Sequence, residues 1–113
     1  MNALRALAAL AGFLAVGFGA FGAHALSASF DPRAADLWDT ATTYALVHAV
    51  AAYAARPPAA AAAFLVGIAL FAGSLYALGL GAPSVMGAIT PLGGVSFLAG
   101  WTIAGVAALR KRD

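Results

Sequence analysis

The chain alternates between long apolar stretches and short breaks that carry its charges and most of its prolines. Its six basic and four acidic side chains fall in a few places, and long uncharged runs separate them. An apolar run of about 18 or more residues is typical of a helix that crosses a membrane. The pattern therefore predicts an all-α membrane protein, a bundle of four transmembrane helices at about residues 5–24, 36–55, 58–79 and 91–109, in a single domain covering 1–113.

The second predicted helix has clear start and stop signals. Asp31 is a good N-cap residue, and Pro32 suits the first helical position. No breaker follows until Pro57 and Pro58, and the residue before a proline resists helical geometry. The third helix starts at those prolines. The connection is therefore very short and predicts an antiparallel helical hairpin.

Glycine and threonine mark the last connection. Gly79 supplies an exit for the third helix. The uncharged stretch that follows it is predicted to be a loop. Thr90 then acts as the cap and Pro91 as the first residue of the fourth helix. The basic tail 110–112 opposes the negative end of that helix's dipole.

The first apolar stretch has features of an export signal as well as of a membrane helix. Arg5 precedes it, and Ala23-His24-Ala25 has the form of a signal-peptidase site. The apolar run from Ala6 to Ala23 is longer than the usual signal core of about 7 to 15 residues. Three more hydrophobic segments follow it. We therefore expect this segment to be a retained membrane anchor.

The amino-acid composition supports a membrane protein and argues against several other classes of protein. Hydrophobic residues make up 64% of the chain and charged residues only 9%, whereas a soluble domain carries about 25% charged residues. The absence of cysteine excludes disulfides and thiol catalysis. Half of the basic residues lie in the tail 110–112, and no basic stripe lies on a soluble face. We therefore expect no nucleic-acid partner.

The basic residues predict the orientation of the chain. Arg5, Arg56 and the tail 110–112 lie on one side of the four-span arrangement, and Arg33 lies on the other. Basic residues favour the cytoplasmic side of a membrane. We therefore expect both termini to be cytoplasmic, in a bacterial cytoplasmic (inner) membrane. The acidic segment 25–39 then faces outward.

Polar residues recur along the second predicted helix. Trp38 lies where an interfacial aromatic anchor belongs. Thr40, Tyr44 and His48 are four positions apart and so share one helix face, which Asp36 extends outward. This row is the most distinctive polar feature within the predicted spans.

His48 is open to two interpretations. A titratable residue near the middle of a membrane is by default a functional hypothesis, here a proton relay or a polar ligand pocket. The structural alternative is a neutral imidazole that is hydrogen-bonded to Tyr76, to Ser74 or to a backbone carbonyl. The sequence leaves both possibilities open.

The two histidines are not expected to share a metal or a haem. At 1.5 Å per residue, His24 and His48 differ in depth by about 18 Å in the predicted arrangement. A common zinc would need both ring nitrogens within about 2.1 Å of the metal. We therefore predict no cofactor. His24 is expected to cap the first span or to pair with Asp31, Asp36 or Asp39.

Small residues recur at helical spacing in three of the predicted spans. In lipid, close packing of small side chains holds helices together. The residues are Ala15, Gly19 and Ala23 with Gly12 and Gly22 in the first span, Gly67, Gly73 and Ser74 in the third, and Gly93, Gly94 and Gly100 in the fourth. Such rows fit packing within one bundle or a seam between copies of the chain, and we favour the first.

Signatures of enzymes and of proton-coupled antiporters are missing. The sequence has no HExxH motif, no Gly-x-Ser-x-Gly motif and no paired carboxylates within a span. Small four-span multidrug antiporters exchange protons through a membrane-embedded glutamate. This chain has no glutamate, and its aspartates lie outside the apolar runs. We therefore predict that the protein is not an enzyme.

Four segments together resemble the small, uncharacterised inner-membrane YgdD family, whose eukaryotic relatives are called transmembrane protein two-five-six. They are GAFGAHAL at 19–26, Trp38 followed by Thr42-x-Tyr44-x-x-x-His48-Ala49, LFAGSLY at 70–76, and ITPLGG followed by GW within 89–101. They cover essentially the whole chain in the right order. The resemblance implies a four-helix membrane protein with no established biochemical activity, and it brings no catalytic residues.

The family pattern also marks candidates for a shared polar core. The candidates are His24, Trp38, Tyr44, His48, Ser74, Tyr76 and Thr90. The function expected is that of a non-enzymatic membrane protein that acts through protein or lipid partners, among them the bilayer, a second copy of the chain or other membrane proteins. The alternative is a small transporter or proton-conducting element that uses the row of Tyr44 and His48.

Overall fold

The helices begin where the sequence supplies a cap or a proline. The structure, a computed structural model, describes residues 2–26 and 28–110. The Asn2 side chain accepts a hydrogen bond of 3.0 Å from the amide three residues later and so caps α1 (Ala3–Phe21). Asp31 caps α2 (Pro32–Ala54) in the same way at 2.7 Å, as the sequence predicted.

The third helix is one continuous rod with an irregular centre. It comprises α3 (Pro58–Gly67), the π-helical turn η2 (Ile68–Ala72) and α4 (Gly73–Gly79). A second π-helical turn, η1 (Gly22–Leu26), extends α1. π-Helical turns are rare and occur frequently at functional sites. Neither turn was predicted from the sequence.

The last connection is more ordered than the predicted loop. A 3₁₀ helix, η3 (Ser84–Ala88), leads into α5 (Thr90–Arg110). Thr90 belongs to α5 instead of preceding it as a cap. Its hydroxyl forms a hydrogen bond with the hydroxyl of Ser74 in α4. The residue predicted to start the helix therefore also joins it to its neighbour.

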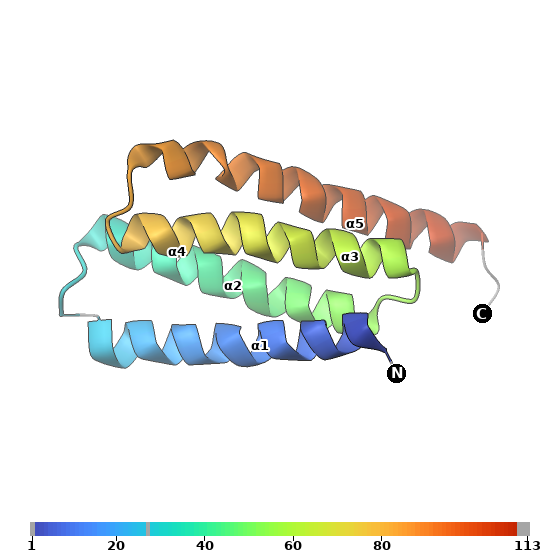
Figure 1. Cartoon of the computed structure of the whole chain (residues 1–113), viewed down its shortest axis with the longest axis horizontal. Helices are drawn as coiled ribbons and strands as arrows, with labels where there is room; N and C mark the ends of the chain where they lie inside the picture. The colour runs from blue at the N-terminus through green and yellow to red at the C-terminus, as the bar shows by residue number, and fades with distance from the viewer. Residues whose placement is uncertain (1, 27, 111–113) are drawn as a thin grey trace.

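The helices form a flattened, diamond-shaped bundle with extents of 50 × 26 × 20 Å. Figure 1 shows α1 and α5 as the outer helices, with α2 and the continuous α3–α4 rod between them. α1 packs mainly on α2, and α5 packs mainly on α3 and η2. The start of α1, the α2–α3 turn and the end of α5 lie at one end of the bundle (Figure 1), which we call the basic end because Arg5, Arg56 and Arg110 lie there.

Within the described residues, all regular structure is helical, as the sequence predicted. Three segments are long and apolar enough to cross a membrane: Ala3–His24, Pro58–Gly79 and Ser84–Arg110. α2 is not among them. It carries charged residues in its first turns and threonine, tyrosine and histidine further along, which lower its hydropathy.

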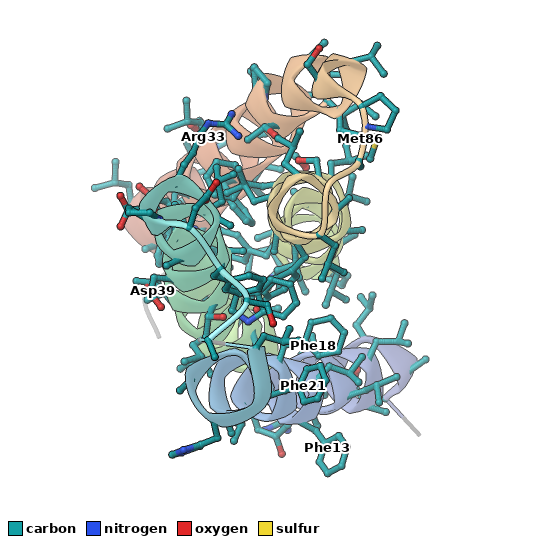
Figure 2. All side chains as sticks on the ribbon, turned by 90° about the vertical axis from the view of Figure 1, so that its left-hand side faces the viewer. Phe13, Phe18, Phe21, Arg33, Asp39 and Met86 are labelled. Carbon is teal, nitrogen blue, oxygen red and sulfur yellow. The ribbon has the colours of Figure 1, made fainter. Side chains whose placement is uncertain are left out.

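The distribution of side-chain sizes is the reverse of that in a soluble protein. Most of the buried apolar residues are alanines, whereas leucine, valine and phenylalanine side chains cover the outside. Phe13 is 74% exposed and points away from the other helices in Figure 2. A contiguous apolar surface of this extent is typical of contact with lipid. The small interior residues let the helix backbones approach closely.

Most of the small residues singled out in the sequence face neighbouring helices of the same chain. A Cβ built at Gly19 would lie 2.9 Å from a Thr42 methyl group, and one at Gly100 would lie 2.6 Å from the Phe64 ring. A Cβ at Gly94 or Gly73 would meet no other atom within 4 Å. Packing within the bundle therefore accounts for the inward glycines, and Gly73 and Gly94 are exceptions to that prediction.

Candidate functional site

The most distinctive polar side chain of the interior is His48 in α2. It is 5% exposed and lies against α3 and α5. Its Nδ1 is 2.8 Å from the backbone carbonyl oxygen of Tyr44, one turn earlier. The indole Nε1–H of Trp101 in α5 donates to His48 Nε2 at 3.1 Å. Both ring nitrogens therefore have partners.

These two partners determine the protonation state of the ring. A backbone carbonyl can only accept a hydrogen bond, and an indole N–H can only donate one. His48 Nδ1 must therefore carry a proton, and Nε2 must offer a lone pair. This is the neutral imidazole with its proton on Nδ1. The other neutral tautomer and the imidazolium ion cannot form the two hydrogen bonds together, because each carries a proton on Nε2.

Aromatic rings enclose this imidazole. The Phe97 ring stacks on His48 with centroids 3.6 Å apart and an interplanar angle of 13°. Phe64 and Trp101 lie at 5.7 and 5.9 Å. The ring of Tyr44, one turn earlier in α2, also stacks on His48, with centroids 5.9 Å apart. We call these five residues the His48 cluster. The imidazole is therefore buried mainly among aromatic rings.

The predicted polar row does not form a continuous path. Tyr44 and His48 share a face, but Tyr44 is 43% exposed on the outside of the bundle while His48 is buried. Thr40 and Asp36, further along the predicted row, are exposed. The row therefore runs from the surface to one enclosed ring instead of through the protein.

A second cluster surrounds Trp38 near the other end of α2. Trp38 was predicted to be an interfacial anchor, but it is only 4% exposed. Its indole N–H donates to the carbonyl oxygen of Phe18 at 2.7 Å, and its ring packs against Phe18, Phe30 and Tyr76. The anchor prediction is wrong because α1 and α4 cover this face of α2. The hydroxyl of Tyr76 pairs with Thr42 at 2.7 Å.

The start of the π-helical turn η1 makes room for the Trp38 indole. A Cβ at Gly22 would collide with Nε1 and Cδ1 of that ring. The amide of Gly22 reaches the carbonyl oxygen of Phe18, which also accepts the indole N–H. Gly22 and the change of helical pitch therefore let a large ring enter the seam between α1 and α2.

Ser74 and Thr90 connect the third and last helices beside η2. The Ser74 hydroxyl donates to the carbonyl oxygen of Phe71 at 3.0 Å and is also paired with the Thr90 hydroxyl. Ser96 of α5 donates to the Ala63 carbonyl oxygen at 2.7 Å. These bonds fix α5 against the α3–α4 rod at two heights.

His24 lies apart from both clusters. It sits in η1 and is exposed. Within the residues that the structure describes, it forms no ion pair with Asp31, Asp36 or Asp39, so that expected pairing is not observed, and the alternative role as a cap of the first span stays a prediction. The three aspartates are themselves exposed. His24 is therefore not part of the polar core.

Sequence reasoning missed several members of the clusters. Trp101 and Phe97 complete the environment of His48, and Thr42 is the partner of Tyr76. Trp101 and Phe97 are four residues apart and so share a face of α5, and Thr42 and Trp101 lie within the segments quoted for the resemblance. Their spacing could have indicated that Phe97 and Trp101 share a face of α5. That this face lies against His48 of α2 could be seen only in the folded structure.

Polar side chains of the described residues pair across the helices. No group of three histidine, cysteine or carboxylate side chains that could hold a metal occurs among residues 2–26 and 28–110. The hydroxyls of Thr42 and Tyr76 bond to each other, and the Ser74 hydroxyl bonds to the Thr90 hydroxyl and to the Phe71 carbonyl oxygen. The geometry therefore describes polar pairs that join helices.

Comparison with known proteins identifies the family of the chain. Residues 18–94 match the family model described as "Protein of unknown function (DUF423)". The chain belongs to the DUF423 family. No solved structure matches the chain.

Curated relatives of this DUF423 chain are named UPF0382 membrane proteins. YwdK of Bacillus subtilis is 37% identical over 97% of this chain and 98% of its own length. A Haemophilus influenzae relative is 40% identical over 88% of both chains. The inner membrane protein YgdD of Escherichia coli is 39% identical over 93% of this chain and 88% of its own. The resemblance found in the sequence is thereby confirmed: the chain is a membrane protein of unknown biochemical activity.

Proposed function

We propose that this DUF423 protein is a non-enzymatic, four-span protein of the bacterial inner membrane, with both termini in the cytoplasm, that acts through protein or lipid partners. The observation that carries the proposal is the enclosed, fully hydrogen-bonded state of His48. A relay or transport residue needs access to water and a second protonation state. The burial of the His48 ring, the stacking of Phe97 on its face and the hydrogen bond from Trp101 to Nε2 argue against both.

The packing of α2 supports its role as the fourth span. A helix of 23 residues is about 34 Å long, enough for a hydrocarbon core of about 30 Å. Its polar groups Thr42 and His48 bond inward to Tyr76 and Trp101. Such bonds reduce the penalty of placing polar residues in lipid.

The absence of native cysteines allows a direct test of this topology. We expect Ser29→Cys to react with a membrane-impermeant maleimide added to intact cells. Arg56→Cys should react only after the membrane is permeabilised, because the basic end faces the cytoplasm. Ser84→Cys, in η3 at the same end as Ser29, provides a second outward position. Labelling of Arg56→Cys in sealed cells would show that the orientation is wrong.

A flux measurement tests the alternative function, a proton-conducting element based on Tyr44 and His48. We expect proteoliposomes with an imposed pH gradient to dissipate it no faster than empty liposomes, because the imidazole is buried and both of its nitrogens are hydrogen-bonded within the protein. The His48→Gln protein should behave identically. A flux that the wild-type protein supports and His48→Gln removes would establish the conducting role and reject the proposal.

A further inference from the structure

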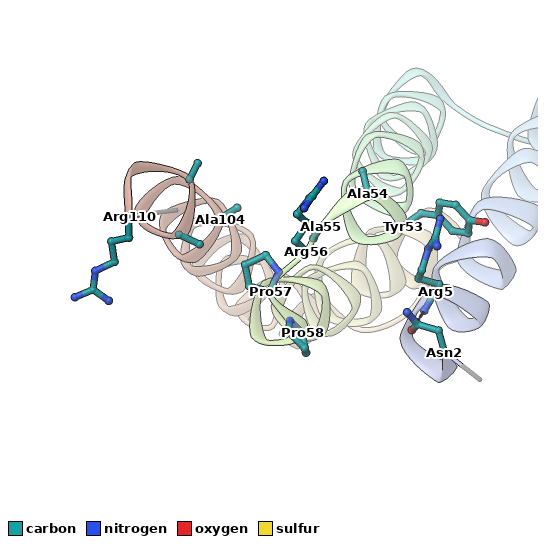
Figure 3. Close-up of a pocket in the computed structure, with 12 residues that line it drawn as sticks. Asn2, Arg5, Tyr53, Ala54, Ala55, Arg56, Pro57, Pro58, Ala104 and Arg110 are labelled. Carbon is teal, nitrogen blue, oxygen red and sulfur yellow. Dashed lines mark hydrogen bonds between the residues drawn. The ribbon is translucent and has the colours of Figure 1, made fainter. Parts of the chain in front are cut away.

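The basic end of the bundle contains an open hollow of about 1400 Å³. The first turns of α1, the end of α2, the α2–α3 turn and the last turns of α5 surround it (Figure 3). It is separate from the clusters around His48 and Trp38. None of the residues of those clusters lines it.

The rim of the hollow is positively charged. Arg5 of α1 and Arg56 of the α2–α3 turn contribute to it, whereas the side chain of Arg110, at the end of α5, points away from both (Figure 3). The Arg5 guanidinium lies 4.2 Å from the centroid of the Tyr53 ring, a cation–π contact that holds it beside the opening (Figure 3).

The wall of the hollow below this rim is apolar and has small side chains. Ala104, Ala107 and Ala108 of α5 face Ala54 at the end of α2. From Arg110 to Ala104 the helix rises about 9 Å, the distance from the head-group level to the upper part of the acyl chains. A site with cations at its mouth and an apolar wall beneath them fits an amphipathic anion.

We propose that this hollow binds an anionic phospholipid of the cytoplasmic leaflet, with its phosphate among the rim arginines and its upper acyl chain along the alanine wall. Guanidinium groups suit phosphate because they present several N–H donors in a fixed plane. A small soluble anion would contact the rim alone and leave the alanine wall uncovered. The inference rests on the proposed function and assigns a lipid as one of its partners.

Native mass spectrometry of the full chain in mild detergent tests the site with phosphatidylglycerol and phosphatidylcholine as probes. The wild-type protein should retain phosphatidylglycerol in preference to phosphatidylcholine. Arg5→Gln/Arg56→Gln should weaken this retention about tenfold or more, since each arginine near an anionic lipid contributes roughly fivefold. The control is Arg33→Gln, which removes a cation from the opposite end and should leave retention unchanged.

A second pair of variants tests the wall without changing charge. Ala108→Phe should narrow the hollow at its alanine wall and lower phosphatidylglycerol retention, whereas Ala99→Phe, on an exposed turn of α5 outside the hollow, should not. Equal retention of both lipids, an Arg33→Gln effect as large as that of the double variant, or full retention by Ala108→Phe would each overturn the proposal. Inorganic phosphate that displaces the lipid at millimolar concentration would overturn it too, because the wall would then contribute nothing.

The lipid site and the proposed topology can fail separately. Lipid retention in detergent does not depend on which side of a membrane the basic end faces. An inverted cysteine-labelling pattern with intact lipid selectivity would reject the orientation and keep the site. The expected labelling pattern without lipid selectivity would reject the site and keep the orientation.

Discussion

Gly93→Ala is expected to destabilise the bundle by about 2 kcal/mol, although alanine is the better helix former. A Cβ at Gly93 would lie 2.7 Å from the Cα of Phe71 and closer still to its backbone nitrogen. Because the obstacle is backbone, no rotamer change relieves the contact, and overpacking of this kind costs about 1–3 kcal/mol. Helix propensity returns at most about 1 kcal/mol. The cost of pushing α5 away from η2 should therefore exceed the gain in helix propensity, and the free energy of unfolding should fall.

The neighbouring glycine provides a matched control. A Cβ at Gly94 would meet no other atom within 4 Å, so Gly94→Ala should be neutral or slightly stabilising. Both variants are compared with the wild type by titration from mild detergent into a denaturing detergent, followed by tryptophan fluorescence. Equal stability of the two variants would show that α5 does not approach η2 as closely as the structure indicates.

The location of the helices could be predicted because their signals are local. Asp31 and the paired prolines Pro57 and Pro58 act within one turn of the helix ends that they define. Predicted and observed helix bounds therefore differ little. The four-residue spacing of Gly19 with Ala15 likewise indicated a helix face, because spacing is a property of one helix.

The partners of the polar residues could not be predicted because they depend on how the helices are placed. Trp38 looked like an interfacial residue from its position along the chain, but the space left by Gly22 of η1 allows it to be buried. Trp101 was recognised only as part of a motif, although it is the hydrogen-bond donor to His48. A histidine's role follows from which groups face it, and spacing within one helix does not contain that information.

The two π-helical turns have no evident sequence signature, yet they lie beside the closest contacts. η2 (Ile68–Ala72) presents the backbone of Phe71 to Gly93. η1 (Gly22–Leu26) begins where the Trp38 indole enters. A change in helical pitch shifts one backbone bond and turns the next residues to a new face. In both places we infer that tertiary packing selects the turn, which explains why local sequence reasoning missed it.

His48→Ala is expected to be the most destabilising change in the polar interior, by about 3 kcal/mol. The substitution removes the ring that stacks on Phe97 at 3.6 Å and leaves a cavity between α2 and α5. It also leaves the indole N–H of Trp101 without its acceptor in an apolar environment. Val47→Ala, at the adjacent exposed position, removes lipid-facing volume and should change stability by about 0.5 kcal/mol or less.

A double-mutant cycle separates the hydrogen bond from the ring packing. Trp101→Phe keeps an aromatic ring in the same place and removes the donor, so its coupling to His48→Ala should be about 1 kcal/mol, near the upper range of hydrogen bonds between membrane helices. The imidazole ¹⁵N spectrum of the wild type should show the proton on Nδ1 and none on Nε2. If His48→Ala were as stable as Val47→Ala, the enclosed ring would have no structural role. The neutral imidazole with two hydrogen bonds would then have to be explained by a ligand. A polar group within the membrane that does not stabilise the fold carries an unfavourable free energy that only a function would justify.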